Sequence, residues 1–104
     1  MTPQDFDTIL ASRLDTIKAV LSSKAGEYAQ EGDRLFNFKQ AAKINNTTAE
    51  KALWGMATKH LISVIDLVDG RLVASSEMVD EKCLDLINYL LLLIAIFAER
   101  REII

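Results

Sequence analysis

The sequence is short of several residue types, and each shortage excludes a class of protein. Cys83 is the only cysteine, so no disulfide can form within the chain, which excludes the small disulfide-stabilised secreted domains. The first residues include Asp5, Asp7 and Arg13, where a signal peptide would be apolar, so we expect a cytoplasmic protein. Glycine-rich phosphate loops, serine or cysteine nucleophile motifs and Cys/His metal-ligand sets are also missing, which excludes the enzyme classes built on them.

Long apolar runs and an excess of positive charge are missing as well. The longest apolar run, residues 89–98, is about half the length that a bilayer crossing requires. The formal net charge is −3, whereas proteins that bind nucleic acid nonspecifically carry a basic patch that displaces counterions from phosphates. We therefore expect neither a membrane nor a nucleic acid among the partners.

The residues that are present predict one globular, all-α domain over residues 1–104. Half of the 104 residues are hydrophobic and 26% are charged, which is the balance of a folding chain. Apolar residues recur at steps of three and four, the period of amphipathic helices. The pattern predicts three long helices, over residues 2–30, 48–68 and 77–100, and a short one after Asp33 that extends through Ala42.

Several predicted helix ends have local signals. Thr2 and Pro3 suit the start of the first helix, and Gly32 interrupts its pattern. A capping box of Thr47 and Glu50 predicts the start of the third helix. Asp69 and Gly70 predict its end, and Ser75 or Ser76 can cap the last helix.

The apolar content exceeds what one thin bundle of this length can cover. The last helix is largely apolar from Leu90 to Phe97, and we expect this run to be core or an oligomer interface, with Trp54 in the core. The chain is therefore expected to complete its bundle by self-association, as a homodimer or a homotetramer.

A polar stripe on the last helix is a candidate metal site. Glu81, Asp85 and Asn88 are spaced by four and three residues, so they share one face of the helix. The same face of the last helix continues into apolar positions beyond Asn88. Extending the first helix places Glu27 at the edge of its apolar stripe, and Glu31 near the centre of that stripe if the helix reaches so far. Carboxylates from two packed helices build metal sites in helical bundles, and oxygen ligands suit Mg²⁺. The alternative is an ordinary solvated helix face.

Other polar residues are candidates for contacts to a phosphate or a base. Lys59 and His60 can bind or protonate a phosphate, although a lone core histidine is equally often structural. Arg34 can form bidentate phosphate contacts and Asn37 can read a base edge, although both also suit an ordinary polar loop. Tyr89 can stack on a base, but a tyrosine that enters an apolar run is usually core.

These residues lie in segments that resemble a known family. The segments span about residues 20–95 and read Glu27-Tyr28-Ala29, Gly32-Asp33-Arg34-Leu35, Asn37-Phe38-Lys39, Lys59-His60, Glu81-Lys82 and Asp85-Leu86-Ile87-Asn88-Tyr89. Together they resemble small phage-type proteins related to the MazG-like, all-α nucleoside triphosphate pyrophosphohydrolases. The resemblance implies an oligomeric helical bundle that uses Mg²⁺, or Mn²⁺ in its place, to hydrolyse nucleotides between the α and β phosphates.

The resemblance also implies roles for individual residues. Glu27, Glu81 and Asp85 are expected to bind the metal, and either Asp33 or Glu31 to complete its shell. The expected catalytic residues are Glu27, Asp33, Lys59 and His60. The residues expected to bind the nucleoside triphosphate are Arg34, Asn37, Asn88 and Tyr89. The alternative hypothesis is a noncatalytic helical module that binds a nucleotide or a protein, and it is favoured by Lys82, which stands where the enzymes carry an acid.

Overall fold

The computed structural model describes residues 1–28 and 32–101, and only the backbone of residues 24–28. Within these limits the protein is all-α, as predicted, with four helices: α1 (Pro3–Tyr28), α2 (Phe36–Ile44), α3 (Ala49–Val68) and α4 (Ser76–Arg100). The prediction of three long helices and one short one is confirmed. None of the helices in the described part of the chain is long and apolar enough to cross a membrane.

Side-chain caps set the starts of three helices. Thr2 Oγ1 accepts a hydrogen bond from the Asp5 amide at 3.0 Å, and Ser75 Oγ accepts one from the Met78 amide at 3.2 Å. On α3 the cap is Thr48, whose Oγ1 accepts from the Lys51 amide at 3.3 Å. The predicted capping box of Thr47 and Glu50 is therefore wrong by one residue. The Glu50 carboxylate pairs instead with Arg100 on α4.

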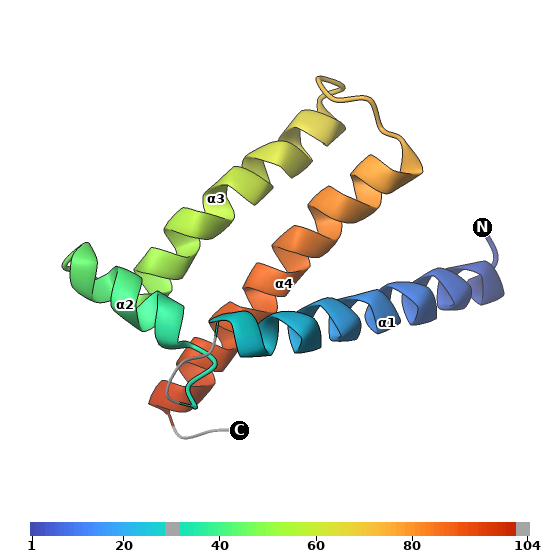
Figure 1. Cartoon of the computed structure of the whole chain (residues 1–104). Helices are drawn as coiled ribbons and strands as arrows, with labels where there is room; N and C mark the ends of the chain where they lie inside the picture. Colours follow the sequence, from blue (N-terminus) through green and yellow to red (C-terminus); the bar gives the residue numbers. More distant parts are fainter. Residues whose placement is uncertain (29–31, 102–104) are drawn as a thin grey trace.

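Helices α3 and α4 form an antiparallel hairpin, on which the other two helices pack (Figure 1). Helix α2 packs on the first half of α3, and the C-terminal part of α1 crosses α4. The main cluster of buried apolar side chains comes from the segment before α2 and from α2, α3 and α4, and it consists of Leu35, Phe38, Leu53, Ala57 and Ile96. The core therefore lies at the α2 end of the hairpin.

Ion pairs fasten the helices at both ends of α4. Arg13 on α1 binds Asp80 through Nε at 3.0 Å and Nη2 at 3.1 Å. At the other end, Arg100 pairs with Glu50. The backbone amide of Glu50, then Arg100 and Thr48, donate hydrogen bonds that lower the pKa of the Glu50 carboxyl to about 2. These contacts hold α1 and α3 against opposite ends of the same helix.

Much apolar surface is left uncovered. Phe6, Leu10 and Leu14, in the first half of α1, are 45–54% exposed, because α1 extends beyond the hairpin (Figure 1). Trp54 is 48% exposed and Ile94 on α4 is 63% exposed. The prediction that Trp54 is core is therefore wrong: the protomer has no fifth element to cover the outer side of the hairpin among its described residues.

Candidate functional site

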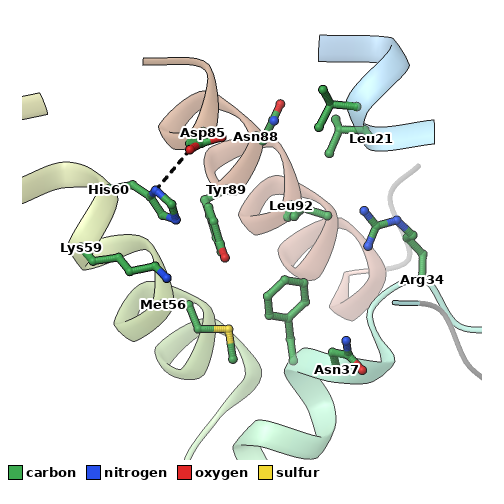
Figure 2. Close-up of a pocket in the computed structure, with 12 residues that line it drawn as sticks. Leu21, Arg34, Asn37, Met56, Lys59, His60, Asp85, Asn88, Tyr89 and Leu92 are labelled. Atoms are coloured by element: carbon green, nitrogen blue, oxygen red, sulfur yellow. Dashed lines mark ion pairs between the residues drawn. The ribbon is translucent and has the colours of Figure 1, made fainter. Parts of the chain in front are cut away.

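A cavity of about 380 Å³ lies where all four helices meet. Its size is that of a pocket for a small molecule. Figure 2 shows its polar side chains reaching in from separate elements. The lining residues are Val20 and Leu21 of α1, Arg34 of the α1–α2 connection, Asn37 and Phe38 of α2, Met56, Lys59 and His60 of α3, and Asp85, Asn88, Tyr89 and Leu92 of α4.

The apolar walls were not predicted from the sequence. They are formed mainly by Leu21, Phe38, Met56 and Leu92. Met56 precedes His60 by one helical turn and Leu92 follows Asn88 by one turn, so each shares a helix face with a polar residue of the cavity. That spacing was the available signal, but it does not distinguish a cavity wall from ordinary core.

Two cationic side chains enter the cavity from opposite sides. Arg34 comes from the connection before α2, and Lys59 comes from α3 (Figure 2). Neither forms an ion pair with any residue that the structure describes. Among the side chains that the structure describes, Asp85 is the only carboxylate on the cavity wall. The described part of the lining is therefore cationic on balance in a chain whose net charge is −3, which favours an anionic ligand.

His60 is held between two residues of α4. Its Nδ1 lies 3.6 Å from Asp85 Oδ2, and its ring stacks on Tyr89 with centroids 4.9 Å apart and planes inclined by 29°. The His60 side chain is 18% exposed. An acid on one side and an aromatic face on the other restrict the rotation of the imidazole, so that it presents one fixed edge to the cavity.

Asn88 supplies a buried polar group to the same cavity. The residue is 8% exposed, and its Oδ1 has no hydrogen-bond partner among the described residues. A buried acceptor without a donor costs free energy, so a ligand that donates a hydrogen bond here would gain from satisfying it. Asn37 adds a second amide from α2.

The described residues do not assemble the predicted metal site. Asp85 lines the cavity, but Glu81 does not. The side chain of Glu81 is 60% exposed, and its carboxylate lies 3.6 Å from Lys82 Nζ. The side chain of Glu27 lies outside the described residues, as does Glu31. Across residues 1–23 and 32–101, no three His, Cys, Asp or Glu side chains lie close enough to hold a metal ion. Of the described side chains in the predicted metal set, Asp85 alone lines the cavity.

Asp33 has a different position from the one predicted. It does not line the cavity. Its Oδ1 accepts from the Leu35 amide at 2.9 Å and its Oδ2 from Lys39 Nζ at 2.6 Å, and the Lys39 contact lowers the pKa of Asp33. Lys39 also contacts Glu99 at 2.7 Å. Because both oxygens are occupied, Asp33 positions the chain that carries Arg34.

The structure therefore brings together seven of the ten predicted site residues around one cavity: Arg34, Asn37, Lys59, His60, Asp85, Asn88 and Tyr89. Glu81 and Asp33 lie elsewhere, and Glu27 is outside the described side chains. The arrangement can bind a flat or apolar group against its walls and an anion between its two cations. No protein-family model, curated protein or solved structure matches the chain.

Proposed function

We propose that the four-helix cavity binds a nucleoside triphosphate. The observation that supports this best is the pair Arg34 and Lys59, two cations without ion-pair partners among the described residues, on opposite sides of a cavity with apolar and aromatic walls. Phosphates suit the cations. A base suits the apolar walls and the edges of the amides Asn37 and Asn88.

For the activity, we propose Mg²⁺-dependent hydrolysis of the triphosphate to a monophosphate and pyrophosphate. The support is the resemblance to the MazG-like enzymes together with the position of Asp85, an acid of the predicted metal set whose described side chain lines the cavity. Bound Mg²⁺ supplies a Lewis acid and an activated water to such reactions. In this chain Arg34 and Lys59 would neutralise the phosphates, and Asp85 would keep His60 oriented.

The second candidate is a noncatalytic nucleotide-binding module with the same fold. Its specific support is Glu81, which points to solvent beside Lys82 instead of joining Asp85. Both candidates include self-association as a homodimer or homotetramer, which the exposed apolar surface of α1, α3 and α4 supports.

One experiment separates these functions. Purified protein is incubated with a panel of canonical and modified deoxynucleoside triphosphates, with Mg²⁺ or with a chelator, and two quantities are measured: pyrophosphate released and the thermal midpoint. The enzyme proposal expects pyrophosphate only with Mg²⁺. A rise in the midpoint without any product supports the binding module. No product and no shift with any nucleotide would refute both.

A further inference from the structure

Asn88 brings an unsatisfied hydrogen-bond acceptor to a wall of the cavity. The residue is 8% exposed, and its Oδ1 is buried without a hydrogen-bond partner among the described residues. Its neighbours one helical turn away on α4 are Leu84, Asp85, Leu91 and Leu92. None of these side chains can donate a hydrogen bond when Asp85 is ionised. A donor for Oδ1 therefore has to come from outside the side chains of α4.

The rest of the cavity limits the kind of donor that can meet Asn88. The described side chains that α1 contributes to the lining, Val20 and Leu21, are apolar. The cations Arg34 and Lys59 suit the phosphates of a nucleotide. A phosphate itself does not satisfy Oδ1, because its ionised oxygens accept hydrogen bonds and do not donate them. In a bound nucleotide, the donor to Asn88 therefore belongs to the base or the sugar.

The charge of Asp85 determines which end of the Asn88 amide is available to a ligand. Asp85 lies one turn before Asn88 on the same face of α4. Side-chain amide dipoles orient in the local field, so the Nδ2 donor is favoured toward the carboxylate and the Oδ1 acceptor away from it. The torsion about the Cβ–Cγ bond of asparagine is soft, so a small rotation can bring Oδ1 to a ligand group at the wall. Asn88 thus offers the ligand an acceptor.

We propose that Asn88 selects bases with an exocyclic amino group, cytosine or adenine, over bases with an oxygen at the same position, uracil, thymine and hypoxanthine. This inference rests on the proposed nucleotide binding and names the class of base. The amino group at C4 of cytosine or C6 of adenine projects from the ring and donates a hydrogen bond, so it satisfies Oδ1. A keto oxygen there brings two acceptors together and leaves Oδ1 without a donor. The ring N–H of a keto base is flanked by that oxygen, so an acceptor that approaches the N–H also approaches the oxygen.

Matched pairs of nucleotides test this preference. The ligands are α,β-methylene deoxynucleoside triphosphates of cytosine and uracil, and of adenine and hypoxanthine, which cannot be cleaved between the α and β phosphates. Each is titrated into the protein by isothermal titration calorimetry, with Mg²⁺ and with a chelator. We expect the amino member of at least one pair to bind wild type about 10- to 100-fold more tightly than its keto partner.

Two variants assign the preference to Asn88. Asn88→Leu keeps the branching of the side chain and removes the acceptor, so the two members of the pair should then bind within about twofold of each other. Asn45→Leu is the matched control, because Asn45 is an exposed amide at the end of α2 that donates to the Ala41 carbonyl at 2.9 Å. Its preference for the amino base should equal that of wild type.

The outcomes separate this inference from the proposed function. Nucleotide binding with equal affinities within both pairs would overturn the base selection and leave the proposed function standing, and this result needs no variant that has to fold. An Asn88→Leu variant that keeps the wild-type preference, or that loses affinity equally for both members of a pair while keeping their ratio, would also overturn it, because Asn88 would then meet the sugar or no part of the ligand. Absence of binding by all four nucleotides would refute both proposals.

Discussion

Removing the two cations of the cavity should weaken nucleotide binding by an amount that the structure bounds. A hydrogen bond to a charged group contributes about 1.5–3 kcal/mol. Lys59 is exposed and Arg34 is half-buried, so solvent screening places Lys59 near or below the lower limit. Since about 1.4 kcal/mol is tenfold in affinity, we expect Lys59→Gln to raise the Kd about tenfold. Arg34→Gln should raise it roughly 10- to 100-fold.

Isothermal titration calorimetry with a nonhydrolysable nucleoside triphosphate measures these changes. The matched control is Lys51→Gln, which removes an exposed lysine from the same helix, away from the cavity. The effects of Lys59→Gln and Arg34→Gln should shrink in high salt, where exposed charges are screened. The reasoning is refuted if Lys51→Gln weakens binding as much as Lys59→Gln, because net charge and not the cavity would then attract the nucleotide.

Further predictions concern stability and specificity. Leu53→Ala empties the fully buried centre of the core and should cost about 2–5 kcal/mol, measured by urea unfolding; a loss below about 1 kcal/mol would contradict the core assignment. Because the pKa of Glu50 is lowered to about 2, its stabilisation is present above about pH 4.5 and is lost as the pH falls toward 2; the thermal midpoint of Glu50→Gln should therefore depend less on pH in that window than that of wild type. Tyr89→Leu should weaken binding of the base more than binding of inorganic triphosphate, and equal weakening of both would place the base elsewhere.

Helix ends were predictable because they depend on neighbouring residues. Ser75 caps α4 and Gly70, with φ +77°, follows the end of α3, and both signals lie within a few residues of the event they cause. The exception is α3. Thr47 and Thr48 are both chemically able to cap it, so the local pattern does not decide between them, and the structure uses Thr48.

The candidate site was predictable in part for the same reason. The positions of Asp85, Asn88 and Tyr89 follow from helical spacing once α4 is known. The position of Glu81 does not, because its rotamer is directed toward Lys82 and solvent. Asp33 was assigned to the site by the family resemblance, but its carboxylate is bound to the Leu35 amide and to Lys39. Whether an acid faces the cavity or binds a neighbouring group depends on tertiary contacts.

Burial was the hardest property to predict. Trp54 has the large apolar side chain of a typical core residue, yet it is 48% exposed. An apolar stripe on a helix does not show whether the surface that covers it belongs to the same chain. Met56 and Leu92 illustrate the opposite difficulty: they line a cavity although their spacing is that of ordinary packing. Whether an apolar side chain is buried, exposed or on a cavity wall depends on where the neighbouring helices end.

The central claim, that the four-helix cavity binds a nucleoside triphosphate, is tested most directly by nuclear magnetic resonance. Amide shifts of ¹⁵N-labelled protein are followed during titration with a nonhydrolysable nucleoside triphosphate. We predict saturating shifts concentrated at Arg34, Asn37, His60, Asn88 and Tyr89, with the amides of Thr8 and Leu10 on the first half of α1 unchanged. Shifts that are absent at millimolar nucleotide, or that concentrate away from the cavity, would contradict the claim.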